Sequence, residues 1–128
     1  MTIASWLITL ASLGLMFGYW FALPEHIRDR EWPLHARFHI IQAFFWISGL
    51  EVAILVLVWW PLQSQERWSL WTLLALLIFT QASHFFAVLI LPKGRPPSRR
   101  NWYDWALGAA LFIYALGLVW AAKTIGIL

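Results

Sequence analysis

The sequence contains no cysteine and few charged residues, and both absences narrow the class of protein. Without cysteine, the chain has no disulfide, no thiolate metal ligand and no cysteine nucleophile. Only 12% of the 128 residues are charged, whereas about 25% is usual for a soluble domain. The hydrophobic share is 62%, and a soluble fold of this size has too little interior to bury so many apolar side chains. This composition disfavours a water-soluble enzyme, a disordered segment and a nucleic-acid binder, and it predicts an integral membrane protein.

Most of the chain falls into four apolar blocks, each close to the length of about 20 residues that a membrane-spanning helix needs. We expect helices over residues 3–23, 34–60, 68–91 and 103–122. All six prolines fall between these blocks, where a ring that interrupts helical hydrogen bonding does no harm. The predicted fold class is therefore all-α, with a single transmembrane domain over residues 1–128 built as a polytopic four-helix bundle.

The basic residues predict how this bundle lies in the membrane. Seven of the nine Lys and Arg residues lie in the loops before the second helix and after the third, which face the same side of a four-helix protein. Because positive charge is retained in the cytoplasm, both loops are expected there, with the N- and C-termini on the non-cytoplasmic side. The expected location is the inner (cytoplasmic) membrane of a bacterium.

Small residues on two of the helices predict close helix packing. Gly14, Gly18 and Ala22 recur every four residues in the first helix, and Gly117 and Ala121 do so in the fourth. Such a stripe lets another backbone approach closely in lipid, where no hydrophobic drive brings helices together. Packing within one chain is the simpler interpretation, and a homodimer through the same stripe is the alternative.

Polar residues inside the second and third blocks form the candidate site. His35 and His39 are four residues apart and share one helix face, which Gln42 continues. His84 lies at a matching depth in the third block, with Gln81 one turn earlier. If the second and third helices are neighbours, His39 faces His84, and these five residues line a cavity near the cytoplasmic face.

Three interpretations of these polar residues remain open. In the first, these residues form a hydrogen-bonded network that fixes the register of the helices. Alternatively, His35, His39 and His84 supply three imidazoles to a metal ion or haem. In the leading hypothesis they bind a lipophilic small molecule, with or without transforming it, since imidazole exchanges protons near neutral pH. The sequence identifies no cofactor and no reaction, so whether the protein is an enzyme stays undecided.

Glu51 is a further polar residue inside an apolar segment, because it lies in the middle of the second apolar block. A charge at that depth costs at least about 2.5 kcal/mol, so the carboxyl is expected to be protonated or paired. On a helical wheel it lies more than about 100° from the His35–His39 face, which indicates a separate site. Glu51 either serves proton-coupled export or accepts a hydrogen bond from Tyr114 or a serine of another helix.

The segment from Trp32 to His39 has the sequence W-P-L-H-A-R-F-H. It resembles the W-P-x-H-A-[RK]-F-H segment of an uncharacterised family of small four-helix membrane proteins, which also agrees with this chain in length and number of spans. The resemblance implies no activity. It implies a signature formed by Trp32, Pro33, His35, Ala36, Arg37, Phe38 and His39.

Together these observations predict a small integral membrane protein that binds a lipophilic molecule in a histidine-lined cavity. The alternatives are a metal- or haem-binding or structural accessory subunit of a membrane complex, and a proton-coupled exporter that uses Glu51. The expected partners are the lipid bilayer, a lipophilic ligand, and either another membrane protein or a second copy of the chain. Nucleic acid is not an expected partner.

Overall fold

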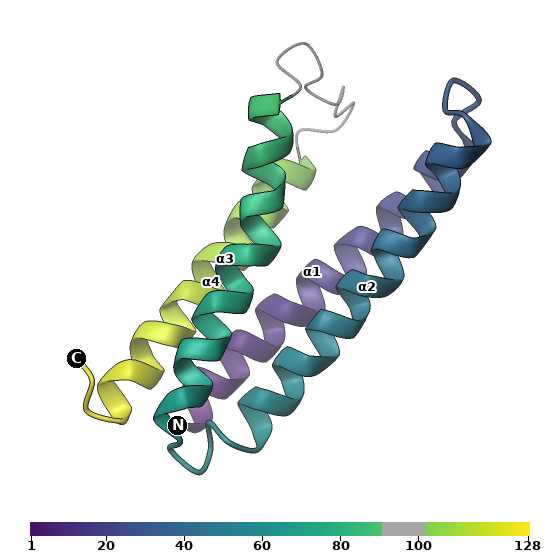
Figure 1. The fold of residues 1–128 in the computed structure, drawn as a ribbon. Coiled ribbons are helices and arrows are strands. Elements are labelled where there is room, and N and C mark those ends of the chain that lie inside the picture. Colours follow the sequence, from purple (N-terminus) through teal and green to yellow (C-terminus); the bar gives the residue numbers. More distant parts are fainter. Residues whose placement is uncertain (91–101) are drawn as a thin grey trace.

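The computed structural model describes residues 1–90 and 102–128, with side chains described for residues 1–80 and 105–128. Consecutive helices run antiparallel, so both termini and the α2–α3 connection lie at one end, and the α1–α2 connection lies at the other (Figure 1). The fold is all-α, with four helices packed together. Their bounds are Thr2–Arg28 for α1, Leu34–Trp59 for α2, Arg67–Ile90 for α3 and Trp102–Thr124 for α4.

The helix bounds agree with the predicted ranges to within 2 residues, except at the end of α1. The prediction ended this helix at residue 23 and placed Pro24 in the loop, but α1 continues through Pro24 to Arg28. A proline removes one backbone N–H and crowds the carbonyl of the preceding turn. Pro24 is exposed near the end of a long helix, where water or headgroups can satisfy the freed carbonyl, so the helix continues.

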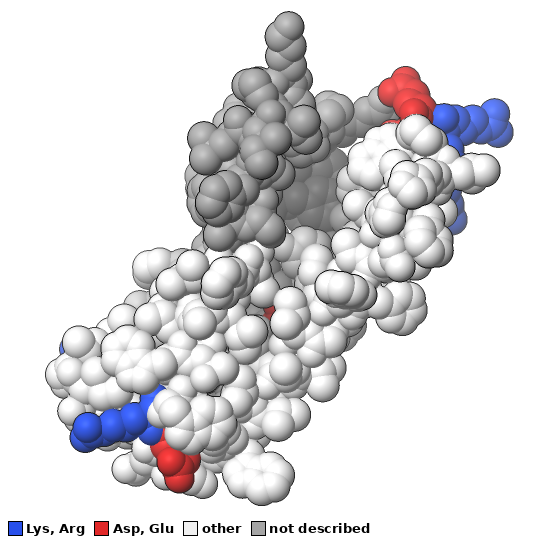
Figure 2. Space-filling model, viewed as in Figure 1, with Lys and Arg blue, Asp and Glu red and all other residues white. Residues whose placement is uncertain are grey.

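The helix surfaces suggest an integral membrane protein. Large apolar side chains point outward, with Phe21 72%, Phe45 63% and Trp46 77% exposed. Figure 2 shows that the charged side chains gather at the two ends of the molecule and leave a broad uncharged band between them. Within the described residues, three helices are long and apolar enough to cross a membrane, namely Thr2–Arg28, Leu34–Trp59 and Trp105–Thr124. An exposed apolar band of this extent indicates contact with lipid.

Helix α1 is the central helix of the bundle. Among the described residues it packs most extensively on α4 and next on α2, whereas α3 contacts α2 and α4 less. The α1–α4 contact is close because of Gly117, where an added Cβ would lie 2.6 Å from Ile8 Cγ1 and 3.2 Å from the Ala4 carbonyl oxygen. Gly117 and Ala121 are both buried, so the close packing predicted for the fourth helix is confirmed.

Among the described residues, the small-residue stripe predicted on α1 does not pack in the same way. Gly14 is exposed, and a Cβ added at Gly14 or Gly18 would meet no described atom within 4 Å. The reason lies in the helix crossing, since α1 and α4 diverge toward the α1–α2 connection (Figure 1). The face of α1 that does pack against α4 lies nearer the termini, around Ala4, Ile8 and Ala11.

Candidate functional site

Polar side chains bridge α1 to α2 and to the connection that follows α2. In each of three pairs a side-chain N–H donates to a hydroxyl oxygen of the partner segment. The pairs are Gln63 with Ser5 (2.7 Å), Trp59 with Thr9 (2.9 Å) and Trp20 with Ser48 (2.9 Å). These contacts fix the register of the two helices, because each bonded hydroxyl has its own donor on the facing segment.

Glu51 of α2 faces the same interface and is 2% exposed. The hydroxyl of Ser12, a fully buried residue of α1, lies close enough to the Glu51 carboxyl to act on it. By distance and angle, however, neither Ser12 Oγ nor Glu51 Oε2 completes a hydrogen bond within the described part of the chain. A buried polar atom without a hydrogen-bond partner lowers the free energy of unfolding by about 1–3 kcal/mol. The pair is therefore the exception in an interface whose other hydroxyls are bonded.

Two tyrosines lie near this pair. Tyr19 of α1 and Tyr114 of α4 are close enough to Glu51 for its charge to act on their phenols. Tyr114 is 1% exposed, and its hydroxyl donates to the Leu73 carbonyl oxygen of α3 at 3.5 Å. Residues of α1 and α4 thus lie within electrostatic range of the Glu51 carboxyl on α2.

The α1–α2 pair and the α3–α4 pair diverge from the end that holds the termini (Figure 1), and the surface is hollowed where they part (Figure 2). Figure 2 also shows acidic atoms at the edge of this hollow, and the described side chains around them are uncharged. Among the described residues, Glu51 is the one acidic residue in the middle of a helix. The described Lys and Arg residues, in contrast, lie at the helix ends.

The histidines of α2 lie on its exposed face, apart from Glu51. His39 Nε2 lies 3.0 Å from His35 Nε2, and His39 Nδ1 lies 3.1 Å from Gln42 Oε1. An amide oxygen only accepts hydrogen bonds, so a neutral His39 carries its proton on Nδ1 and donates it to Gln42. His39 Nε2 then accepts from the Nε2–H of His35. Three of the predicted site residues are therefore brought together in one chain of contacts.

The other two residues of the predicted site, Gln81 and His84, lie in the part of α3 whose side chains are outside the described residues. The ribbon of α3 diverges from α2 toward this end, whereas the prediction required the two helices to be neighbours there (Figure 1). Among the described side chains, no group of three or more His, Cys, Asp or Glu residues converges on a point that could hold a metal ion. The three-imidazole site stays a prediction.

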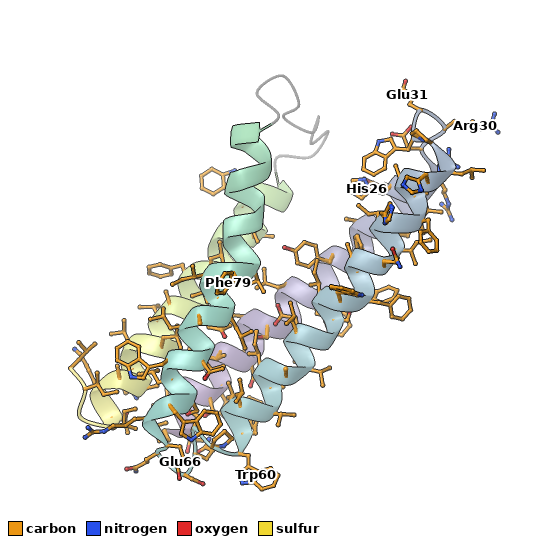
Figure 3. All side chains as sticks on the ribbon, in the orientation of Figure 1. His26, Arg30, Glu31, Trp60, Glu66 and Phe79 are labelled. Atoms are coloured by element: carbon orange, nitrogen blue, oxygen red, sulfur yellow. The ribbon has the colours of Figure 1, made fainter. Side chains whose placement is uncertain are left out.

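The α1–α2 connection is held by contacts beside the histidine pair. Arg37 Nε donates to the Trp32 carbonyl oxygen at 3.0 Å. The ring of His26 stacks on Trp32 with a centroid distance of 5.2 Å. Figure 3 shows His26 at this end of α1, near Arg30 and Glu31 of the connection. The W-P-L-H-A-R-F-H segment thus joins the connection to the first turns of α2.

Sequence reasoning missed the polar contacts of α1, although a signal was present. Ser5, Thr9 and Ser12 are spaced by four and three residues, so they share one face of a helix. A stripe of small hydroxyl residues in an otherwise apolar helix is typical of a buried helix–helix contact in a membrane.

No protein family model matches the chain, and no curated protein or solved structure is significantly similar to it. The resemblance of the Trp32–His39 segment to a family of small membrane proteins therefore stays a prediction. Fold and site define an all-α protein that has, within its described residues, three helices long and apolar enough to span a membrane and a buried carboxyl in the middle of α2.

Proposed function

We propose that this integral membrane protein binds a lipophilic small molecule in the hollow between its two helix pairs. The observation that carries the proposal is the buried Glu51–Ser12 pair, of which Glu51 Oε2 and Ser12 Oγ both lack a hydrogen-bond partner among the described residues. In a bilayer, water is not at hand to satisfy such atoms, and intramembrane ionisable residues are rare unless they serve a function. A ligand with one polar group supplies the missing partner.

The surroundings of Glu51 match those of a ligand site. Small-molecule sites are mostly apolar and hold few polar groups, which orient the ligand. The described side chains that line the hollow are uncharged, and acidic atoms are visible at its edge (Figure 2). A second depression, between α3 and α4 near the C-terminus, is lined almost entirely by apolar side chains such as Leu74, Leu118 and Ile127. It offers little to orient a ligand, so the hollow is the better site.

We further propose that the α1–α2 connection lies in the cytoplasm. Arg28, Arg30 and Arg37 lie around this connection, whereas Arg67 and Lys123 are the basic residues described at the opposite end. The excess of positive charge supports a cytoplasmic position for this end and an outside position for both termini.

The test of the proposed function uses N,N′-dicyclohexylcarbodiimide, a lipophilic reagent that modifies carboxyl groups within membranes. If lipophilic molecules enter the hollow, the reagent modifies Glu51 of the protein in lipid nanodiscs, as located by peptide mass spectrometry. A water-soluble carbodiimide serves as the control and should modify the exposed Glu31 and Glu66 instead. If saturating lipophilic reagent leaves Glu51 unmodified, lipophilic molecules do not reach the hollow and the proposal is wrong.

A second candidate function, binding of a divalent transition metal, is favoured by the histidine pair of α2. The Nε2 atoms of His35 and His39 are 3.0 Å apart. Two nitrogen ligands of a tetrahedral zinc ion, at bond lengths of about 2.0–2.1 Å, lie about 3.3 Å apart. Gln42 orients the His39 ring through Nδ1, as the outer partners of metal ligands do.

Zinc titration of the purified protein tests this candidate. We expect His39→Ala to lower the zinc affinity at least about tenfold, a loss comparable to those seen when metal-site partners are removed. His26→Ala is the matched control, because His26 stacks on Trp32 instead and should leave the affinity unchanged. Equal zinc affinity in wild type and His39→Ala would exclude this site.

A further inference from the structure

The depression between α3 and α4, called the α3–α4 groove from here on, has a volume of about 240 Å³ and apolar walls. Its lining side chains on the two helices are Leu70, Trp71, Leu74, Leu118, Val119 and Ala122. Ile127, which follows α4, lines it as well. Neither Glu51 nor the histidine pair of α2 belongs to this lining, so the groove is separate from both sites discussed above.

The size and the walls of the α3–α4 groove suit a segment of hydrocarbon chain better than a whole small molecule. Pockets for small molecules usually measure about 300–1,000 Å³ and contain a few polar groups that orient the ligand. This groove is smaller, and its lining is apolar. Trp71 and Val119 are 57% and 46% exposed, so the groove opens on the lipid-facing surface. An acyl chain of the bilayer can therefore lie in it and gain van der Waals contacts on several sides.

Two basic side chains lie at the end of this groove. Arg67 begins α3 and lies one turn before Leu70 and Trp71, so it shares their helix face. Lys123 lies one turn after Val119, in the last turn of α4. Because α3 and α4 are antiparallel, the two residues lie at the same end of the molecule (Figure 1). Both are exposed, and neither side chain forms an ion pair with a described residue.

The charge and the depth of this end suit a phosphate group. Among the described residues, Glu66 is the one acidic side chain here (Figure 3), so two positive side chains stand against one negative side chain. Trp68 and Trp120 are exposed at this end, and tryptophan is enriched where hydrocarbon meets the headgroups. Arginine and lysine at that level both bind phosphate oxygens through charge-assisted hydrogen bonds.

We infer that the α3–α4 groove binds one anionic phospholipid, with an acyl chain in the groove and the headgroup phosphate against Arg67 and Lys123. A free phosphate ion would leave the apolar groove unused, and an uncharged lipid would leave the two cations without a partner. A zwitterionic phospholipid has the same phosphate, but its cationic group is repelled by the same two side chains. The site is independent of the proposed function and of the metal candidate.

Photocrosslinking in nanodiscs of phosphatidylcholine tests the inference at the groove itself. Traces of phosphatidylglycerol or phosphatidylcholine, each with the same diazirine-bearing acyl chain, are crosslinked to the protein, and the adducts are located by peptide mass spectrometry. Val56 of α2 provides the internal control for lipid that is not specifically bound. It is 56% exposed and lies 3 residues before the end of α2, at the same end of the molecule as Val119.

We expect the ratio of phosphatidylglycerol to phosphatidylcholine adducts to be at least about fivefold higher around Val119 than around Val56. The double variant Arg67→Gln/Lys123→Gln should lower the ratio at Val119 to that at Val56. Both substituted residues are exposed, so the fold is retained. Arg28→Gln/Arg30→Gln is the matched control, because it removes two exposed positive charges at the opposite end and should leave the ratio at Val119 unchanged.

A second pair of variants tests the position of the acyl chain. Val119→Phe fills the groove and should reduce phosphatidylglycerol adducts on the facing α3 peptide, around Leu70 and Leu74, at least about threefold. Val56→Phe adds the same bulk outside the groove and should leave these adducts unchanged.

Three results overturn the inference. The first is an equal lipid ratio around Val119 and Val56 in wild type. The second is a high ratio at Val119 that survives the loss of Arg67 and Lys123. The third is the absence of adducts of either lipid from the groove, which would mean that protein covers it. None of these results bears on whether the lipophilic carbodiimide modifies Glu51, so the proposed function is tested separately.

Discussion

Among the buried hydroxyls of α1, those of Thr9 and Ser12 have opposite surroundings. Thr9 Oγ1 accepts a hydrogen bond from Trp59 at 2.9 Å, whereas Ser12 Oγ has no partner among the described residues. A partnered hydroxyl stabilises its helix pair, while an unpartnered one contributes nothing and keeps its desolvation cost. Similar hydroxyl side chains therefore differ in role: Thr9 bonds the neighbouring helix, whereas Ser12 lies unbonded beside Glu51 among the described residues.

Removing these two hydroxyls should have different effects on stability. We expect Thr9→Val to lower the free energy of unfolding by about 0.5–1.5 kcal/mol, because it leaves the Trp59 N–H without its acceptor. Ser12→Ala should change it by less than about 0.5 kcal/mol or stabilise the protein, since it removes a buried group that has no partner. Reversible unfolding in mixed micelles measures both values. A larger loss for Ser12→Ala than for Thr9→Val would contradict this assignment.

The sequence predicts part of the candidate site. Glu51 stands out because burying a charged carboxyl at that depth of a membrane is energetically unfavourable. The helical period also separates it from His35 and His39. The proximity of Ser12 depends on how α1 and α2 are aligned, and single-sequence periodicity contains no information about that register. The sequence also shows that Gln42 shares a face with His39, but the 3.1 Å contact between them depends on side-chain conformations.

At the scale of helices, the sequence predicts where most helices begin and end. Hydropathy and proline placement define these bounds, because a long apolar run in lipid must satisfy its backbone hydrogen bonds within a helix. The exception at Pro24 arises because a proline near a helix end costs less than one in its middle. Which helices become neighbours was not predictable. Small residues on α1 and α4 both suggest close packing, and only the crossing of the helices shows that Gly117 packs while Gly14 does not.

This contrast predicts opposite outcomes for two glycine substitutions. Gly117→Ala should lower the free energy of unfolding by about 1–3 kcal/mol, because the new methyl group overlaps Ile8 and the backbone of α1. Gly14→Ala has open space and should be neutral or stabilise the helix by up to about 1 kcal/mol.

Denaturant titration of both variants under identical conditions gives these values. Destabilisation by Gly14→Ala together with tolerance of Gly117→Ala would mean that α1 packs through the stripe that contains Gly14. A change in oligomeric state confined to Gly14→Ala would instead point to the homodimer considered from the sequence.

At the scale of the molecule, the charges lie at two ends separated by an apolar band (Figure 2). Glu31 and Glu66 are exposed and lie at opposite ends (Figure 3). Helices α1 and α2 contain 27 and 26 residues, which correspond to about 40 Å of helix and exceed the roughly 30 Å hydrocarbon core. The ends therefore reach the headgroup region on both sides.

The absence of native cysteine makes the orientation directly measurable. We prepare Glu31→Cys and Glu66→Cys and treat intact bacterial cells with a maleimide that does not cross the cytoplasmic membrane. Glu66→Cys should be modified in intact cells, and Glu31→Cys only after the cells are permeabilised, because the arginines around residue 31 keep that end inside. The reverse pattern would invert the proposed orientation. Modification of both in intact cells would contradict a membrane-spanning α2.

The central position of α1 also has a consequence for how the protein is made. During synthesis α2 follows α1 directly, so the contacts of Thr9 and Ser48 with their tryptophan partners can form early. The neighbouring face of α1, around Ile8, packs against α4, which leaves the ribosome last of the four helices. Until then this face of α1 meets only lipid or another protein's helix. Docking of α4 is thus a late step in the folding of these four helices, and a chain stopped before it would leave exposed a surface that the folded bundle hides.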